Sequence, residues 1–492
     1  MITPFLVFLV ALMAALFLLP KLARIAKVIG LLDKPAEKRK VHKLPRPLVG
    51  GIGMMISATF AAMVFIPDRG LRGFFLGVAV LLLVGFLDDF KELGHRQKFL
   101  AQIVATALLI FFSKVTLVSF GDLLGIGELA VPGFDWLIWM VTVFCVVGVI
   151  NAINLVDGLD GLAGGISFVA FTAFAVHASL ADNQTLMLLN LALAGAVLGF
   201  LRYNWYPSTM FMGDAGSLSL GFSLAFMALA LTQGENAKVS PVCPLLILAV
   251  PITDTLTVMA KRILRGESPF KADKYHLHHI FMRFGMGRVM AVKTIIGITA
   301  GMSVVSFLGP LYGAEDFHLF LVFLGYFTIY VVSSFYIIHT MRASLKLKKK
   351  SGELREHGNW LGRLVTGRMS FFEVFRKSPR YDVELSLVCR ERERNLEFPG
   401  KVLNISSDGF MAAVPQLDCL LDRVTAKITF PIEGQSHSIE IPAEHLWFSE
   451  QHHTFFHGFR FLDFGGDNEE IVFKFLVKFK ERGRLVNKAG LA

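Results

Sequence analysis

Residues 134–165 read FDWLIWMVTVFCVVGVINAINLVDGLDGLAGG, an apolar run that becomes polar at its end. The run over 134–153 is long enough to cross a bilayer as a helix, which takes about 20 apolar residues. At its end, polar side chains recur every third residue, at Asn151, Asn154, Asp157 and Asp160. Such a spacing brings side chains to one side of a helix, and the interleaved glycines let a ligand approach closely. Tight helix packing would explain the glycines but not the polar side chains, so the stretch predicts a membrane protein with a polar site at the membrane surface.

The same apolar pattern extends over most of the chain. Of the 492 residues, 54% are hydrophobic and 18% are charged. The first apolar stretch lacks a basic segment before it and a small-residue cleavage site, so we interpret it as a helix rather than a signal peptide. About eleven stretches are long enough to span a membrane, and they lie approximately at 3–20, 48–66, 74–90, 99–113, 134–153, 163–181, 185–201, 215–232, 241–260, 292–311 and 318–340.

Composition divides the chain into three parts. Residues 1–340 form the predicted integral membrane domain, and 341–369 form a basic linker that would contact anionic headgroups or act as a stop-transfer flank. Residues 370–482 read as short alternating strands, which predicts a small β-barrel. The predicted fold class is therefore a polytopic α-helical membrane protein followed by a small cytoplasmic barrel. The predicted strands are Tyr381–Cys389, Gly400–Ile405, Val424–Phe430, Ser436–Pro442 and Phe455–Phe461.

Lysine and arginine predict the orientation. The loop over 21–46 is rich in both, whereas the loops on the opposite side offer only Arg69, Arg72, Lys114 and Lys238. Positive charge marks the cytoplasmic side, so we expect the N-terminus outside and the C-terminal domain in the cytoplasm. The unusual polar clusters then all fall on the cytoplasmic side, in the loops around 91–98, 154–162, 202–214 and 261–291.

Carboxylates stand at the ends of these apolar stretches: Asp88, Asp89, Asp157, Asp160, Asp214 and Asp254. A charge inside a membrane costs roughly 2.5 to 3.5 kcal/mol even on lenient scales, so such residues usually mark a substrate or ion site. The pair Asp88 and Asp89 suits a divalent metal or a proton acceptor, although interfacial charges that reach water are the structural alternative. Asp214 and Asn154 are our first choice for magnesium, which prefers oxygen donors and is completed by water and substrate phosphates.

The loop over 261–291 supplies positive charge and imidazoles. It contains Lys261, Arg262, Arg265, Lys271, Lys274, His276, His278 and His279. No cysteine and no Glu-flanked histidine pair accompanies them, which argues against zinc. A cationic, hydrogen-bonding loop that faces carboxylates and magnesium is suited to a nucleotide diphosphate. Membrane topology alone would explain the lysines but not the histidines.

Four strings together resemble a known family over roughly residues 1–340: DDFKE (88–92), NAINLVDGLDGLAGG (151–165), FMGDAGS (211–217) and HLHH (276–279). In this order and on this topology they look like the polyprenyl-phosphate N-acetylhexosamine-1-phosphate transferases. The resemblance implies transfer of a sugar-1-phosphate from a UDP-N-acetylhexosamine to undecaprenyl phosphate, with release of UMP. It also implies a requirement for Mg²⁺, for which Mn²⁺ could substitute.

The resemblance implies roles for individual residues. Asp88 and Asp89 match the aspartate pair near the lipid phosphate, and Lys98 matches a lysine that contacts phosphate. The other matches are Asn154 and Asp214 as metal ligands, Asp157 and Asp160 as nucleotide-site carboxylates, and His276, His278 and His279 as the histidine motif. Asn151 and Arg262 are further candidates for substrate binding.

Two details of the motifs bear on the branch of the family. Glu92 stands where many bacterial relatives have a third aspartate, which leaves its role open. HLHH resembles the N-acetylglucosamine branch more than the three consecutive histidines of the phospho-N-acetylmuramoyl-pentapeptide transferases. We therefore expect N-acetylglucosamine-1-phosphate to be the transferred group, with the peptidoglycan enzyme as the alternative.

The C-terminal part carries a second resemblance. The segments 376–380, RKSPR, and 404–409, NISSDG, look like the two signatures of a PilZ domain. This implies a receptor for cyclic di-GMP, in which Arg376 and Arg380 grip the ligand by bidentate and stacking contacts. Asn404, Ser406 and Gly409 would line the site.

Joined, the two parts predict an enzyme of the bacterial inner membrane that initiates a surface or secreted polysaccharide under the control of cyclic di-GMP. A transporter is a rival from another class, but it predicts polar residues at mid-membrane depth, and a non-catalytic sensing scaffold is a third. The net charge of +10 follows from membrane topology, so we expect membrane lipids and no nucleic acid as partners. A homodimer is left open, and the cysteines lack any disulfide or metal spacing.

Overall fold

The computed structural model divides into two compact units, Met1–Phe371 and Phe372–Ala492. The part of the chain that it describes comprises residues 2–33, 45–67, 69–91, 93–234, 237–264, 266, 268, 276–283, 286–350, 381–391, 397–405, 409–415, 423–432, 435–451, 454–462, 471–472 and 475.

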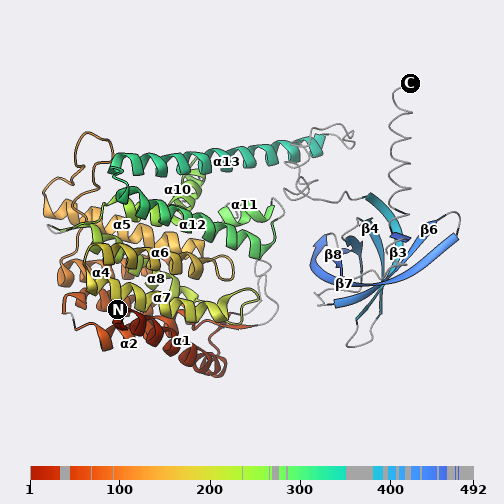
Figure 1. Cartoon of the computed structure of the whole chain (residues 1–492), viewed down its shortest axis with the longest axis horizontal. Helices are drawn as coiled ribbons and strands as arrows, with labels where there is room; N and C mark the ends of the chain where they lie inside the picture. The colour runs from red at the N-terminus through yellow and green to blue at the C-terminus, as the bar shows by residue number, and fades with distance from the viewer. Residues whose placement is uncertain are drawn as a thin grey trace. The chain divides into compact units, whose positions relative to one another are not determined.

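The first unit is a bundle of helices (Figure 1). In Figure 1 the first two helices lie along one side of the bundle and the last two along the other. The helices are α1 (Ile2–Ile29), α2 (Gly50–Phe65), α3 (Arg72–Lys91), α4 (His95–Ser113), α5 (Asp135–Val156), α6 (Leu162–Leu180), α7 (Gln184–Asn204), α8 (Gly213–Thr232), α9 (Val242–Ile247), α10 (Ala249–Ile263), α11 (Leu277–Arg283), α12 (Arg288–Leu311) and α13 (Asp316–Lys350).

The helical membrane protein predicted from the sequence is confirmed. Among the described residues, 8 helices are long and apolar enough to cross a membrane, and α2 is a shorter apolar helix. The ninth predicted span, 241–260, falls on two helices, α9 and α10, that meet at Leu248. Pro251 cannot donate to the carbonyl four residues earlier and clashes with it, which accounts for a break at this point. The number of crossings and their direction stay predictions.

Helix α8 lies at the centre of the bundle. Every residue over 215–227 is buried, because α8 packs against α3 and α5 and small side chains let helices approach closely in a membrane. A Cβ added at Gly51 would lie 2.1 Å from the Cα of Gly216, and one added at Gly85 would lie 2.3 Å from the Cα of Ala215. These glycines bring the start of α2 and the end of α3 against the first turn of α8, where Asp214 stands.

The second unit contains a closed barrel with the strand order β3-β4-β5-β8-β7-β6, as the PilZ-like prediction requires. Its strands are β3 (Tyr381–Glu391), β4 (Glu397–Ile405), β5 (Gly409–Ala413), β6 (Arg423–Ile432), β7 (Gln435–Gln451) and β8 (Thr454–Phe461). Closure leaves no free sheet edge, and alternate side chains such as Phe410, Phe430 and Phe459 fill the interior. Strand β5 was not predicted, because five residues directly after the NISSDG motif are too short to show alternation.

Candidate active site

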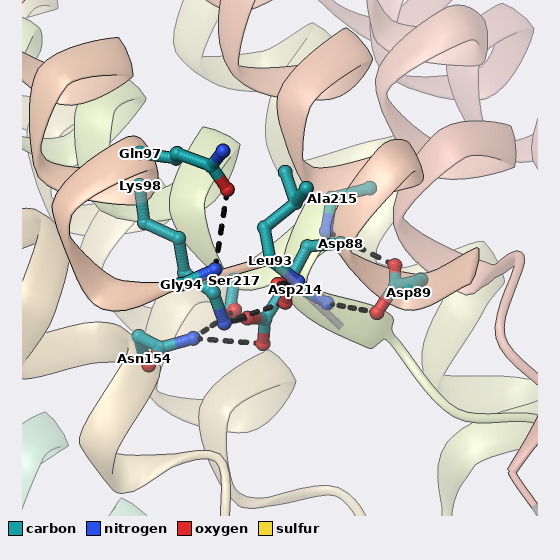
Figure 2. A network of polar contacts seen from close by, with 10 residues as sticks. All are labelled: Asp88, Asp89, Leu93, Gly94, Gln97, Lys98, Asn154, Asp214, Ala215 and Ser217. Atoms are coloured by element: carbon teal, nitrogen blue, oxygen red, sulfur yellow. Dashed lines mark hydrogen bonds and ion pairs between the residues drawn. The ribbon is translucent and has the colours of Figure 1, made fainter. Parts of the chain in front are cut away.

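A lysine joins two of the predicted carboxylates. The Nζ atom of Lys98, on α4, lies 2.5 Å from Asp88 Oδ2 on α3 and 2.5 Å from Asp214 Oδ2 on α8 (Figure 2). The other oxygen of Asp88 accepts a hydrogen bond of 2.7 Å from the backbone N–H of Leu93, in the turn between α3 and α4. Charge-assisted contacts of this length are among the stronger ones in proteins. Three helices thus converge on one ammonium group.

Asp89 has a different environment from its neighbour Asp88. Its Oδ1 accepts a hydrogen bond of 2.8 Å from the backbone N–H of Asp214, and its Oδ2 accepts one of 3.3 Å from that of Ala215. The side chain therefore satisfies two free N–H groups at the start of α8 and complements the positive end of its dipole. Gly213 has a φ of +74°, and a Cβ there would lie 2.4 Å from Asp89 Oδ2, so this contact requires a glycine. Asp89 positions Asp214.

Asn151 and Asn154 belong to the polar stripe, the set of polar side chains at every third position from 151 to 160, and they lie at the end of α5. Asn154 Nδ2 donates to Asp214 Oδ1 at 3.2 Å and to Ser217 Oγ at 2.7 Å. Asn151 lies one turn earlier and does not share these contacts, since its Nδ2 donates to Gln102 Oε1 at 2.7 Å and to the carbonyl of Val147. Asn154 is therefore a direct member of the cluster, whereas Asn151 is tied to α4 beside it.

Asp157 and Asp160 lie in the turn between α5 and α6. Burial, together with the neighbouring charges of Asp214 and Asp160, raises the pKa of Asp157 to about 7. Asp160 Oδ2 accepts a hydrogen bond of 3.0 Å from the backbone N–H of Ser208 and lies 3.5 Å from Arg46. The buried Asn204 fixes this turn, because its side chain accepts from the N–H of Gly161 and donates to the carbonyl of Met210.

Sequence reasoning missed several residues of this site. Arg46, counted only as a topological charge, forms a hydrogen bond with Ser208 and an ion pair with Asp160. Gln102 and Ser217 also contact the stripe. A polar residue in an apolar stretch is a usable signal for Gln102, but nothing local distinguishes Arg46 from the other basic residues of its loop.

The histidine segment, residues 276–279, is held by Asp254. This carboxylate accepts hydrogen bonds of 2.9 Å from His276 Nδ1, 2.9 Å from the N–H of Leu277 and 2.5 Å from the hydroxyl of Tyr330. It takes no part in the Lys98 contacts. Burial and the adjacent His279 lower the pKa of His278 to about 3, so His278 is neutral at pH 7. It can act as a neutral hydrogen-bonding group, and the positive charge of this loop comes from its lysines and arginines.

The histidine segment also touches the turn between α5 and α6. A Cβ added at Gly158 would lie 2.7 Å from His278 Nε2, so the imidazole rests directly on this glycine, between Asp157 and Asp160. The rings of His278 and His279 lie 4.2 Å apart. Two motifs more than a hundred residues apart in the sequence therefore meet.

The remaining candidates lie elsewhere. Arg262 is only 1% exposed, which places its side chain inside the helical unit. In the barrel, Asn404 lies near the end of β4 and Gly409 begins β5. Glu92, Arg376, Arg380 and Ser406 lie outside the described residues.

The donor set can be tested for its fit to magnesium. Within the described residues, no three histidine, cysteine, aspartate or glutamate side chains form a metal-holding group. Magnesium is usually held by one or two carboxylates, with water and substrate phosphates completing its shell. Asp214 offers carboxylate oxygens and Asn154 an amide oxygen, and the two side chains are adjacent, with the amide nitrogen of Asn154 facing Asp214. The chemistry of this pair fits magnesium.

Comparisons with known proteins find a family match for each of the two units. The model of glycosyl transferase family 4 matches residues 71–232, and that of the PilZ domain matches 375–478. The first match includes Lys98, Asn154 and Asp214, and the second includes the whole described barrel. A helical membrane unit with this cluster belongs to the class of membrane-embedded transferases.

Individual relatives identify the family more closely. The chain is 34% identical to the "Probable undecaprenyl-phosphate N-acetylglucosaminyl 1-phosphate transferase" of Bacillus subtilis over 61% of this chain and 83% of that protein. It is 33% identical to the "Undecaprenyl-phosphate alpha-N-acetylglucosaminyl 1-phosphate transferase" of Pasteurella multocida over 70% of this chain and 94% of that protein. The chain therefore belongs to glycosyl transferase family 4 and carries a PilZ domain at its C-terminal end.

Proposed function

We propose that this protein transfers N-acetylglucosamine-1-phosphate from UDP-N-acetylglucosamine to undecaprenyl phosphate and releases UMP. The observation that carries the proposal is the position of the Lys98 ammonium group between Asp88 and Asp214. The three residues come from three different helices, α4, α3 and α8. The names of the relatives support undecaprenyl phosphate as the acceptor and N-acetylglucosamine-1-phosphate as the transferred group. The product would initiate a surface or secreted polysaccharide.

In the proposed reaction, an oxygen of the lipid phosphate attacks the sugar-proximal phosphorus of the nucleotide sugar. The bond from that phosphorus to the UMP oxygen breaks, and UMP leaves. A phosphate monoester has a second pKa near 6, so the attacking group is already largely deprotonated at pH 7 and a general base would gain little. Catalysis then depends mainly on positioning and on charge stabilisation. Lys98 offsets phosphate charge, and Asp88 orients Lys98.

Magnesium is the cofactor that we propose, with Asp214 and Asn154 as its protein ligands and Mn²⁺ as a substitute. Bound there, the ion would reduce the repulsion between two phosphate-bearing substrates. Asp89 would keep Asp214 in place through the backbone N–H groups at the start of α8. His278, neutral and adjacent to Gly158, would donate a hydrogen bond to the nucleotide sugar.

We further propose that cyclic di-GMP regulates the transfer through the PilZ domain. Arg376, Arg380 and Ser406 would bind the ligand together with Asn404 and Gly409. The family match and the closed barrel support this part of the proposal. The enzyme would lie in the inner membrane, with both sites on the cytoplasmic side, where UDP-sugars and cyclic di-GMP are made.

The test is transfer by the purified full-length protein in detergent. A panel of radiolabelled UDP-N-acetylhexosamines, including UDP-N-acetylmuramoyl-pentapeptide, is offered with undecaprenyl phosphate and Mg²⁺, with and without cyclic di-GMP. We expect lipid-linked product from UDP-N-acetylglucosamine alone. Product only from the pentapeptide donor would indicate the peptidoglycan reaction. Binding of cyclic di-GMP without any transfer would support a sensing scaffold and overturn the proposal.

A further inference from the structure

The last membrane helix, α13, contacts the active-site side of the bundle through one row of side chains. The hydroxyl of Tyr330 donates to Asp254 Oδ1 at 2.5 Å. One turn later, Ser334 forms a hydrogen bond with Lys261, which belongs to α10 as Asp254 does. Residues four apart lie on the same face of a helix, so α13 presents a polar face to α10. In an apolar environment such contacts are specific, because an unpaired partner would be costly.

Asp254 links this face to the histidine segment. The carboxylate is 1% exposed and also accepts hydrogen bonds from His276 Nδ1 and from the N–H of Leu277. Leu277 begins helix α11 and His276 directly precedes it, so the same buried group holds both α13 and the beginning of the HLHH motif. A displacement of Tyr330 would change the position or the hydrogen bonding of Asp254.

The histidine segment has little room to move independently. A Cβ added at Gly158 would lie 2.7 Å from His278 Nε2. The imidazole therefore packs directly against the turn that carries Asp157 and Asp160. A shift of His276 would therefore be passed to the glycine turn by direct contact. A continuous chain of direct contacts therefore runs from Tyr330 to Asp254, then to the histidine segment, and ends at Gly158.

We propose that Tyr330 is a positioning residue for the nucleotide sugar, acting through Asp254 on the histidine segment. The inference rests on the proposed function, since it concerns the site at which the UDP-sugar would bind.

The test compares Tyr330→Phe with Tyr326→Phe in the full-length protein. Both variants lose one buried hydroxyl group from α13, one turn apart, but within the described part of the chain the Tyr326 hydroxyl has no hydrogen-bond partner. For Y330F we expect the KM for UDP-N-acetylglucosamine to rise about tenfold, as for the loss of one hydrogen bond to a buried charge. The KM for undecaprenyl phosphate should stay within about twofold of the wild-type value. Y326F should match the wild type in both constants.

Binding without turnover separates this role from a general loss of structure. Calorimetric titration with UDP-N-acetylglucosamine, without lipid acceptor and well below the unfolding transition, should show the same tenfold weakening in Y330F, which should melt only a few degrees below the wild type because Asp254 loses one of its three donors. Equal changes in both KM values, or identical constants in Y330F and Y326F, would overturn the inference. If the wild-type protein transfers no sugar, it is the proposed function that fails, because the titration alone still tests the positioning role.

Discussion

Two aspartates of the helical unit, Asp214 and Asp254, stand in opposite kinds of environment. Asp254 is 1% exposed and accepts three hydrogen bonds, from His276, Leu277 and Tyr330. The side chain of Asp214 is 27% exposed, and it shares the Lys98 ammonium group with Asp88. Asp254 is enclosed by fixed hydrogen-bond donors. Asp214 is partly open to solvent and lies near other carboxylates, with which it shares a single lysine, Lys98.

The difference shows how one residue type serves two purposes in a membrane enzyme. A carboxylate with a full set of buried donors has no capacity for a ligand, so its role is to fix the elements around it. A carboxylate that is accessible and incompletely neutralised has a favourable interaction left for a cation or for a substrate bound through one. This comparison predicts that substitutions at the two positions affect different quantities.

The largest effect should come from Asp214→Asn, which keeps the size of the side chain and removes its charge. We expect kcat to fall on the order of 10³-fold, as for the loss of a central electrostatic group, with the melting temperature nearly unchanged. Transfer of labelled sugar to undecaprenyl phosphate measures the first quantity, and thermal unfolding in detergent measures the second.

Asp182→Asn is the matched control for this substitution. Asp182 is exposed and pairs with Lys238 in loops away from the cluster. The same chemical change there should leave kcat unaltered. Similar losses of activity in both variants would contradict the assignment of Asp214.

The next largest effect should be on stability, in Asp254→Ala. Removal of one partner from a buried charged network costs roughly 3 kcal/mol, because His276, Leu277 and Tyr330 would each lose an acceptor. The midpoint of thermal unfolding should therefore fall by several degrees, with a smaller fractional loss of kcat than in D214N. An Asp254 variant that unfolds like the wild type would break the comparison.

The fold was predictable from the sequence where local chemistry dominates. Long apolar stretches can only be helices in a bilayer, since every backbone group must be satisfied internally, and alternating stretches predicted five of the six barrel strands. The break at Leu248 and the strand β5 were missed. The first depends on one proline within an apolar run, and the second is too short to show a pattern.

The site was predictable only in part, for a physical reason. Charges at the ends of apolar stretches identified Asp88 and Asp214, because a membrane makes such residues conspicuous, whereas Lys98 was proposed through the family resemblance. The sequence could not tell that Asp89 binds the start of α8, since partners more than a hundred residues away determine that role. Arg46 was missed for the same reason.

The two residues of the aspartate pair sharpen the comparison further. In Asp89→Ala, the start of α8 loses two hydrogen bonds, which for a helix terminus costs typically about 1 kcal/mol. We expect a modest fall in the melting temperature and a loss of activity smaller than in D214N, because Asp214 is displaced rather than removed. Asp89→Asn should recover part of both, since its carbonyl oxygen can still accept one bond. Full loss of activity at wild-type stability in D89N would instead give Asp89 a direct part in the reaction.

The smallest effect concerns the dependence of stability on pH, and it arises at Asp157. The pKa of this carboxyl is raised from an ordinary value of 3.8 to about 7 by burial and by the charges of Asp214 and Asp160. Between these two values the folded protein binds the proton more tightly than the unfolded chain does. The resulting stabilisation is therefore complete below about pH 4 and is lost as the pH rises through about 7. Asp157→Asn lacks this contribution, so its melting temperature, measured in a metal chelator, should fall less than that of the wild type between about pH 5 and pH 8. All other titrating groups are common to both proteins. If the melting temperatures of the two proteins fall equally between about pH 5 and pH 8, Asp157 is already ionised in the folded protein and belongs with the accessible carboxylates.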